Sequence, residues 1–380
     1  MPVLAKYRCW AEIDLAALER NLGKIRAGLP KHIQYVAVVK ADAYGHGLHQ
    51  TVARLMQSGA DAFAVANVYE GAEVRAIGAG WPILVLGALL EEEDPYLIEH
   101  TLTATVSSSA EVQRLNHFGA ENQRPIDVHL KIDTGMGRLG VYYREALPLY
   151  QEIVRAQHLR LRGIYTHFSS ADSDPEYTTD QRICFLNTIS TFPDLPRKDL
   201  LIHADNSAGL ETFTSKSPFN AIRVGLLQFG LVPYEQSLLA QLKPEPVLSF
   251  HSRVSLIKKL PAGTAISYGR TFRLRKDSRI GIITAGYGDG IPVAASNRAH
   301  VIIRGRRCPV IGRVTMDQTV VDLSNHPDVQ SGDQVTLIGQ QETEHIDVVE
   351  FSKWCHSIPW ETFCSITQRV PRVYRTARLV

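Results

Sequence analysis

The chain has 380 residues, of which 44% are hydrophobic and 21% are charged, enough apolar material for two ordinary hydrophobic cores. Its 41 basic and 39 acidic residues give a formal net charge of +2. This balance argues against a protein that binds nucleic acid through excess positive charge, and we interpret the run Arg304, Arg306 and Arg307 as the solvated edge of a hairpin.

The sequence predicts neither export nor a membrane span nor a metal site. The amino terminus lacks the basic start and apolar core of a signal peptide. The longest apolar stretch, residues 83–90, is shorter than the ~20 residues of a membrane helix. The five cysteines include no C-x-x-C pair, which indicates reduced thiols and no zinc site. We therefore expect a cytoplasmic protein that binds no membrane.

Residues 33–225 alternate short β-branched runs with longer segments of helical periodicity, a pattern typical of β-α units on a parallel sheet. Helices are predicted at residues 48–58, 68–77, 109–117 and 145–157. Eight such units in roughly 200 residues predict a (β/α)8 TIM-type barrel. Its predicted strands are residues 33–40, 62–66, 83–86, 104–107, 126–132, 161–168, 200–203 and 221–224.

Beyond Pro244 the pattern changes to strands separated by glycine and proline turns, with one helix predicted at residues 346–357. Together with a strand at 8–13, these segments predict a second, mostly antiparallel β domain. We expect the barrel to span residues 14–243, and the β domain to comprise 1–13 with 244–380. The predicted strands of the β domain are 248–260, 265–268, 280–285, 300–304, 319–323 and 334–338.

Reactive polar residues follow the predicted barrel strands, where the loops of such a barrel form the site. Lys40 ends the first strand after an apolar run, and a buried ammonium is costly unless it is paired or neutral. A lysine of lowered pKa is the standard nucleophile for a carbonyl cofactor, although a lone strand-end lysine can also reach solvent. After strands seven and eight, the Ser207 hydroxyl and the Gly225 amide offer a phosphate site. The other polar residues near strand ends are Lys131, Arg138, His167 and Arg223.

Over essentially its whole length the chain resembles alanine racemase, because eight motifs follow one another in that family's order and approximate spacing. The first two are the most specific. The motifs are AVVKADAYGHG, KIDTGMGRLG, THF, NSAG, RVG, ISYGRTF, GYGDG and MDQTVVD.

The resemblance implies a pyridoxal 5'-phosphate enzyme that interconverts L-alanine and D-alanine. Lys40 matches the family's Schiff-base lysine, and Tyr44, Ser207 and Gly225 match its phosphate contacts. Arg223 matches the arginine that faces the pyridine nitrogen, where a charged guanidinium makes the ring a weaker electron sink. The alternative for Arg223 is a barrel-rim arginine paired to Asp205.

Racemisation needs proton carriers on opposite faces of the substrate's α carbon. Lys40 matches one carrier and Tyr268 the other. In the family this tyrosine comes from the neighbouring subunit, which implies a homodimer with shared active sites. His167 matches a histidine that links Arg223 to the tyrosine, and nearby positive charge would favour a phenolate whose usual pKa is about 10. Read without the motifs, Tyr268 and His167 could be packing residues.

The resemblance also implies residues that bind the substrate. Arg138 and the amide of Met316 match contacts of the substrate carboxylate, and Tyr287 resembles a gate at the substrate entrance. Lys131 matches a lysine that the family carries as its carbamate (N-carboxylysine), whose negative charge orients the arginine. We expect this modification here, unless Asp133 bridges to Arg138 instead.

Four positions depart from the family pattern. Trp360 stands where a tyrosine usually reaches the cofactor phosphate, and its indole N–H could keep that contact. Thr315, Val293 and Phe229 replace a cysteine, an arginine and a tyrosine. They leave open a broader-specificity racemase that acts on serine or other small amino acids. A barrel-type pyridoxal phosphate decarboxylase would carry an acidic residue opposite the ring nitrogen, which Arg223 argues against.

Overall fold

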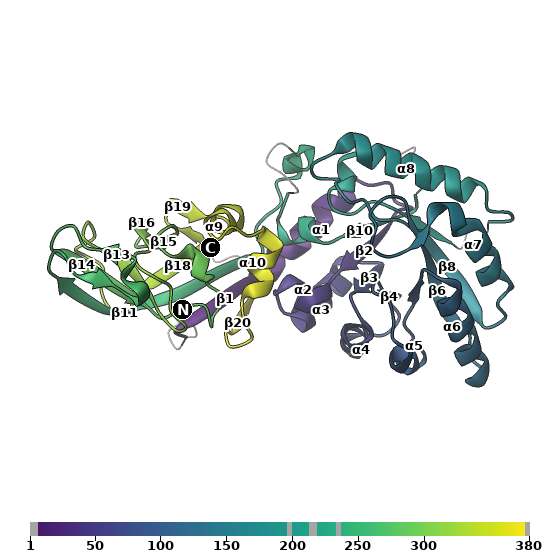
Figure 1. The fold of residues 1–380 in the computed structure, drawn as a ribbon, viewed down its shortest axis with the longest axis horizontal. Helices are drawn as coiled ribbons and strands as arrows, with labels where there is room; N and C mark the ends of the chain where they lie inside the picture. Colours follow the sequence, from purple (N-terminus) through teal and green to yellow (C-terminus); the bar gives the residue numbers. More distant parts are fainter. Residues whose placement is uncertain (1–6, 196–199, 213–218, 233–236, 377–380) are drawn as a thin grey trace. The chain divides into compact units, whose positions relative to one another are not determined.

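The computed structural model describes residues 7–195, 200–212, 219–232 and 237–376, and its internal contacts divide the chain into two compact units (Figure 1). The barrel unit comprises Ala17–Ala43 and Leu48–Glu245, and the β unit comprises Met1–Ala16, Tyr44–Gly47 and Pro246–Val380. Among the described residues, no helix combines the length and apolar character needed to cross a membrane.

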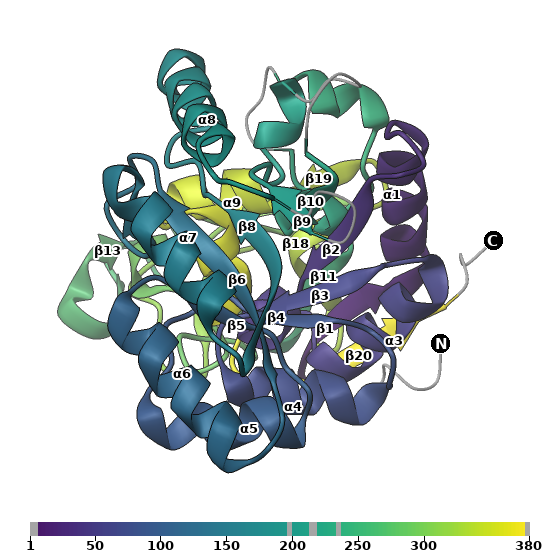
Figure 2. The same cartoon turned by 90° about the vertical axis from the view of Figure 1, so that its right-hand side faces the viewer.

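The barrel unit is a ring of parallel strands with helices on its outside (Figure 2). One sheet has the order β10-β2-β3-β4, and the other follows the path β5-β6-β8-β9, with the short β7 (Val141–Tyr142) added to β6. A parallel bridge between Leu84 and Thr103 joins the two sheets on one side. On the other side, the amide of Arg223 donates to Asp205 O at 2.9 Å. The ring strands are β2 (Gln34–Val38), β3 (Ala62–Val65), β4 (Ile83–Val85), β5 (Ala104–Val106), β6 (Ile126–Asp133), β8 (Leu159–Tyr165), β9 (Leu201–His203) and β10 (Ala221–Val224).

The helices around the ring form where apolar residues recur at helical spacing, and in α4, α6 and α8 a polar side chain caps the first turn. In α3, the buried residues Leu48, Thr51, Val52 and Leu55 form one face. Asn67 caps α4 by accepting a hydrogen bond from the Glu70 amide at 3.0 Å. The helices are α1 (Leu15–Ala27), α3 (Leu48–Ser58), α4 (Val68–Ile77), α5 (Asp94–Glu99), α6 (Ser109–Glu121), α7 (Ala146–Arg155) and α8 (Pro175–Ser190).

The eight predicted barrel strands each overlap an observed strand, so the predicted barrel is confirmed. The first barrel strand, β2, ends at Val38, two residues before Lys40. The sixth barrel strand, β8, ends at Tyr165, two residues before His167. Both side chains therefore lie in the loops at the carboxyl ends of strands rather than within the strands.

The β unit is organised around the long strand β11 (Leu248–Leu260). Its antiparallel neighbours are β1 (Cys9–Asp14), β14 (Ser278–Ile283) and β18 (Gln334–Gln341). On its other edge, β1 pairs in parallel with β20 (Arg372–Arg375). The amino-terminal strand thus belongs to this mostly antiparallel sheet, as expected. The remaining elements are β12 (Ala265–Ile266), β13 (Phe272–Arg273), β15 (His300–Ile303), β16 (Arg306–Pro309), β17 (Thr319–Asp322), β19 (Glu344–Ile346), α9 (Val348–Trp354) and α10 (Pro359–Ser365).

The predicted strand at residues 265–268 was too long. β12 ends at Ile266 because Ser267 adopts a φ of 60°. Tyr268 then begins a tight turn in which Gly269 and Arg270 also have positive φ values, of 70° and 52°. Tyr268 therefore lies on a loop tip rather than in the sheet.

The predicted helix at residues 346–357 was wrong in its extent. Ile346 ends β19, and α9 stops at Trp354 because His356 takes a φ of 53°. The second helix, α10, was missed, although Pro359 at its first turn is a favoured start.

The arginine run forms a hairpin between β15 and β16, as predicted, with Arg304 and Gly305 at its turn. Each arginine also has an acidic partner, so the run is neutralised locally. The ion pairs are Arg304–Asp333, Arg306–Asp328, Arg307–Glu344 and Arg307–Glu350.

Candidate active site

Lys40 is half-buried and begins α2 (Lys40–Tyr44), which is a left-handed turn. Ala41, Asp42, Ala43 and Tyr44 have φ values of 54°, 54°, 52° and 54°. Left-handed backbone costs about 1–2 kcal/mol for each residue with a Cβ. Strained backbone of this kind is concentrated at functional sites, and here it directly follows the predicted cofactor lysine.

Two carboxylates hold this turn on the barrel unit. Glu70, on α4, accepts hydrogen bonds from the amides of Ala41 at 2.6 Å and Ala66 at 2.8 Å. The Asp42 carboxylate accepts from the Leu48 amide at 2.7 Å, which caps α3. These charge-assisted bonds offset part of the backbone strain.

The predicted phosphate contact Tyr44 belongs, with Gly45–Gly47, to the β unit. There the Gly45 carbonyl accepts a hydrogen bond from Arg372 Nε at 3.1 Å. A Cβ on Gly45, whose φ is 75°, would lie 2.3 Å from Phe363 O, so only glycine fits this approach. The segment after Tyr44 is therefore fixed by α10 and by the start of β20.

Positive side chains from several barrel strands converge on His167. Burial lowers the pKa of His167 well below its usual value, and the charges of Arg223, Lys131, Arg138 and Lys40 lower it further. His167 is therefore neutral at physiological pH. The structure brings these predicted site residues together at the carboxyl ends of the strands, as their sequence positions implied.

Lys131 lies inside the barrel on β6, and in the described part of the chain its Nζ has neither a hydrogen bond nor an ion pair. Its Nζ lies over the ring of Tyr165, 5.4 Å from the centroid. Burial is the main cause that lowers the pKa of Lys131 to about 8, and Arg223 and Arg138 act in the same direction.

Asp133 does not bridge to Arg138. Its Oδ1 accepts hydrogen bonds from the amides of Gly135 and Met136, each at 2.9 Å, and its Oδ2 accepts from the Gly137 amide at 3.0 Å. No carboxylate lies within ion-pair distance of the exposed Arg138 in the ranges that the structure describes. The alternative to a carbamate on Lys131, in which Asp133 would orient Arg138, therefore lacks its acidic residue.

Arg223 is buried, and its guanidinium is held by the barrel interior. It donates to Thr166 O at 2.8 Å and Ala204 O at 3.0 Å, and it contacts His167 Nδ1 at 3.1 Å. Burial lowers the pKa of Arg223 to about 10, so it stays charged at neutral pH. The alternative of an Arg223–Asp205 ion pair was wrong, because the Asp205 carboxylate binds Arg182 at 2.7 Å.

Two buried histidines that the sequence analysis missed extend from Arg223. Nη1 of Arg223 lies 2.7 Å from His203 Nδ1, and His203 Nε2 lies 3.1 Å from His129 Nδ1. A guanidinium only donates, so His203 accepts at Nδ1 and carries its proton on Nε2, and His129 in turn accepts at Nδ1. Burial and the charge of Arg223 lower the pKa of His129 to about 3, which keeps it neutral.

Only part of the signal for this network, the alternation along β6, was present in the sequence. His129 and Lys131 alternate along β6 and so point to the same side of the strand. Gly163, opposite His129 on β8, makes room for the imidazole, since a Cβ there would lie 2.5 Å from the ring. A polar residue at an interior barrel position that faces a glycine on the neighbouring strand is the pattern that marks His129.

Ser207 and Gly225, the two predicted phosphate contacts of the barrel, are joined to each other. Ser207 Oγ accepts from the amides of Gly225 at 3.1 Å and Leu227 at 3.3 Å. Because both of these bonds are accepted, the hydroxyl proton remains available for donation to an anion.

The β unit carries the other predicted residues, three of them on exposed loops and one on a helix. Tyr268 is 72% exposed. Tyr287 and Met316 lie on adjacent segments, because the Tyr287 amide donates to Thr315 O at 2.9 Å. Trp360 is half-buried on α10.

The departures from the family pattern take different structural positions. Val293 is exposed, whereas Phe229 is buried. Thr315 uses its hydroxyl to donate to Gln318 O at 2.8 Å, which closes the turn 315–318.

The protein is a barrel enzyme with a second, β domain. Its site combines the strained turn at Lys40, the buried network of Arg223 and histidines, and the cations that converge on His167. Residues 13–233 match the family described as "Alanine racemase, N-terminal domain", and residues 247–374 match "Alanine racemase, C-terminal domain". The chain belongs to the alanine racemase family and is an isomerase.

Relatives and solved structures agree along the full length of the chain. Alanine racemase of Halothermothrix orenii is 38% identical over 368 residues, covering 96% of each chain. That of Nostoc sp. is 37% identical over 373 residues, covering 96% of this chain and 95% of its own. The structure of alanine racemase from Clostridium difficile has a TM-score of 0.90 at 32% identity, covering 98% of this chain and 96% of that chain. The Bacillus anthracis enzyme, solved with bound L-Ala-P, has a TM-score of 0.87 at 31% identity, covering 97% and 95%.

Proposed function

We propose that this chain interconverts L-alanine and D-alanine with pyridoxal phosphate as its cofactor, and that Lys40 and Tyr268 carry the proton. The observation that carries the proposal is the convergence of Lys40, Lys131, Arg138 and Arg223 around a neutral His167. The two carboxylates nearest to them in sequence, Asp42 and Asp133, both accept hydrogen bonds from backbone amides. Such a site favours anionic ligands, and both the phosphate of the cofactor and the carboxylate of alanine are anions.

The residues present fit pyridoxal phosphate. Lys40 supplies an amine for the aldehyde, and Ser207 keeps a free hydroxyl proton for the phosphate, close to the Gly225 amide. Tyr44 and Trp360, from the β unit, are the further phosphate contacts of this proposal. When bound, the cofactor would supply an electron sink that acidifies the α C–H of the amino acid.

Arg223 would face the pyridine nitrogen. Its accepting partners, His203, His167, Thr166 O and Ala204 O, fix the guanidinium in place before any ligand arrives. A cation held there leaves the ring nitrogen unprotonated and so limits how much negative charge the ring accepts. This favours return of the proton over side reactions, and it disfavours the alternative of a decarboxylase, which would need an acidic residue at this place.

Lys40 and Tyr268 would move the proton between opposite faces of the α carbon. Lys40 stands at the start of the strained turn, beside the other cations that converge on His167. Tyr268 is 72% exposed on a loop tip of the β unit, which is how a residue offered to a second subunit would stand. We therefore propose a homodimer with shared active sites, in which the Nε2–H of His167 and the charge of Arg223 stabilise the phenolate of the partner's Tyr268.

The substrate carboxylate would be held by Arg138 and by the Met316 amide, with Tyr287 as a gate. Lys131 would orient Arg138 after reacting with carbon dioxide, which gives the carbamate and releases one proton. A pKa of about 8 leaves roughly a quarter of the amine neutral at pH 7.5, far more than the usual lysine value near 10.5 allows. The buried Nζ has no other described partner, which supports this modification.

Alanine is the substrate that we propose, because the relatives carry that name and one was solved with L-Ala-P. The exposed Val293, which stands where the family commonly has an arginine, keeps serine as a second candidate. Parallel assays of racemisation with alanine and serine would decide between them.

Replacing the proposed second base tests the mechanism. In Tyr268→Phe, exchange of the α hydrogen of L-alanine with deuterated water should fall by at least about 100-fold, within the range that a general base contributes. Exchange from D-alanine should fall much less, because Lys40 remains. Equal loss in both directions, with cofactor bound as in the wild type, would contradict the assignment of faces.

A further inference from the structure

The segment 365–369 binds the loop 286–290, which carries Tyr287, at three successive points. Ser365 Oγ shares its proton between Thr362 O at 2.8 Å and Gly290 O at 3.3 Å, and Thr367 Oγ1 donates to Gly288 O at 2.7 Å. Arg369 then forms a bidentate pair with Asp289, through Nε at 2.9 Å and Nη2 at 3.0 Å. The loop is thus held from one side by side chains of a single short segment.

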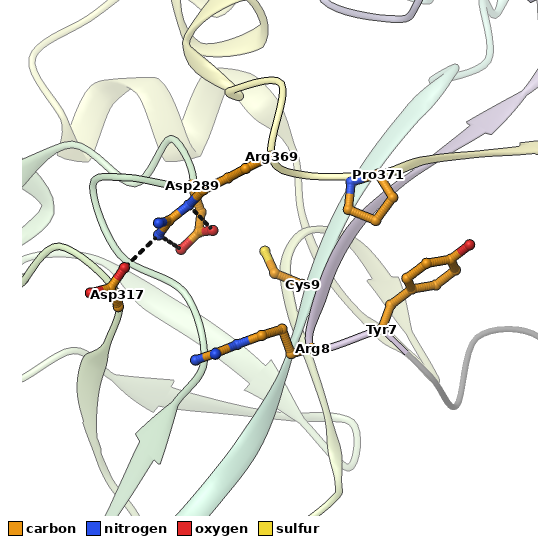
Figure 3. A pocket seen from close by; sticks show the side chains of 7 residues that line it. All are labelled: Tyr7, Arg8, Cys9, Asp289, Asp317, Arg369 and Pro371. Carbon is orange, nitrogen blue, oxygen red and sulfur yellow. Dashed lines mark hydrogen bonds and ion pairs between the residues drawn. The ribbon is translucent and has the colours of Figure 1, made fainter.

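Arg369 also binds the turn 315–318, which carries Met316. Its Nη2 lies 2.9 Å from Asp317 Oδ1 and donates to Met316 O at 3.3 Å. Figure 3 shows the guanidinium between the carboxylates of Asp289 and Asp317. These three residues line a cavity of about 450 Å³. One side chain therefore ties together two loops that are far apart in the sequence.

The two loops touch backbone to backbone, and glycines make this approach possible. A Cβ on Gly286 would lie 2.1 Å from Thr315 O. A Cβ on Gly288 would lie 2.7 Å from Arg369 Nη2, so the glycine leaves the space that the guanidinium occupies. Any shift of one loop must therefore move the other.

This packing fixes the direction of the Met316 amide. Thr315 O accepts from the Tyr287 amide, and Met316 O accepts from the Gly288 amide, each at 2.9 Å. In a trans peptide the N–H points opposite to the carbonyl, so the Met316 N–H points away from the loop 286–290. It makes no hydrogen bond to any part of the chain that the structure describes, which leaves it able to donate to a ligand.

We propose that Arg369 is a positioning residue for the substrate carboxylate: it locks the loop 286–290 and the turn 315–318 together, so that the Met316 amide keeps its direction. The inference rests on the proposed role of Met316 in binding that carboxylate. Asp289 is only 7% exposed, so loss of Arg369 leaves a nearly buried carboxylate without its cation and releases the loop. A lysine could pair with one carboxylate but could not reproduce the bidentate fork.

The test compares Arg369→Met with Arg369→Lys and with Arg306→Met in the holoenzyme. Arg306→Met is the matched control, because it also removes an arginine from an ion pair, with Asp328, on a hairpin of the same unit. Two competitive probes separate the substrate's groups: propionate has the carboxylate without the amine, and ethylamine has the amine without the carboxylate. Hydrogen exchange of residues 286–290 and 315–318 reports the loops directly.

In Arg369→Met the inhibition constant of propionate should rise by about 10-fold or more, the usual effect of losing a hydrogen bond to a charged group. Ethylamine should change by less than twofold, exchange in both loops should accelerate, and Arg369→Lys should fall between. Equal weakening of both probes, or no change in either, would overturn the proposal. If Arg369→Met does not fold, Asp317→Asn removes one arm of the clamp and should weaken propionate alone by a smaller factor.

The wild type separates this inference from the proposed function. Propionate that competes with alanine in the wild type, yet binds Arg369→Met with unchanged affinity, contradicts the role of Arg369 alone. Propionate that does not compete in the wild type contradicts the carboxylate site, and the proposal for Arg369 falls with it.

Discussion

Nη1 of Arg223 lies 2.7 Å from Nδ1 of His203 inside the barrel, where both side chains are buried. The arginine can only donate, so the histidine must accept and must remain neutral. The contact therefore fixes at once the place of the guanidinium and the tautomer of the imidazole. His203 does not titrate near neutral pH, because burial and the charge of Arg223 hold its pKa well below the usual value.

His203→Leu should lower kcat by about 10- to 100-fold, because a hydrogen bond to a charged group is worth about 1.5–3 kcal/mol and Arg223 would lose its position. His203→Gln can still accept from Arg223 and donate to His129, so it should stay within a few-fold of the wild type. Steady-state kinetics with measured cofactor content compares the two variants. Equal losses in both would show that packing, rather than the acceptor, matters at this position.

The buried neutral histidines should make the barrel unit sensitive to acid. The pKa of His129 is about 3 in the folded chain, against an ordinary value near 6.5 when unfolded. Between these values the unfolded chain binds the extra proton, so stability is lost as the pH falls below about 6.5. His129→Gln should reduce the pH dependence of the unfolding free energy by about 1.4 kcal/mol per pH unit between pH 4 and 6.

Denaturant unfolding at a series of pH values measures this slope. His117→Gln is the matched control, because it makes the same substitution at an exposed histidine of α6. A slope in His129→Gln equal to that of the wild type would contradict the account of a buried neutral imidazole.

Lys131 should take up labelled carbon dioxide. Its lowered pKa, near 8, supplies neutral amine, and Arg138 lacks a described acidic partner that would make the carbamate redundant. In ¹³C-bicarbonate the wild type should show one protected carbamate resonance that Lys131→Ala lacks. Lys131→Ala should also raise the KM for alanine by about 10-fold, since Arg138 loses its orienting charge. A wild type without the resonance, yet with full activity, would remove Lys131 from the proposed mechanism.

The barrel and the strand-end residues could be predicted because their signals are local. Alternating strand and helix patterns place Lys40, His167 and Arg223 at carboxyl ends, and the structure brings them together. His129 and His203 were missed because a histidine within an apolar strand resembles a packed core residue until its partner on another strand is known. That partner, Arg223, lies 20 residues from His203 in sequence, and no local pattern connects them.

Other features depend on long-range contacts in the same way. Ala41, Asp42 and Ala43 have no glycine among them, so composition gives no sign of a left-handed turn. The turn is stable because Glu70 on α4 binds the Ala41 amide. The clamp at Arg369 likewise depends on two acidic residues about 50 and 80 positions away, which only the folded β unit brings to one guanidinium.

The central claim, that Lys40 holds pyridoxal phosphate, is tested most directly by borohydride reduction followed by mapping of the labelled peptide. The protein reconstituted with pyridoxal phosphate should be yellow, should lose its visible absorbance on reduction, and should carry the reduced cofactor on Lys40. Lys40→Ala should show no such band. A wild type that stays colourless with added cofactor, or a label on a lysine other than Lys40, would contradict the account.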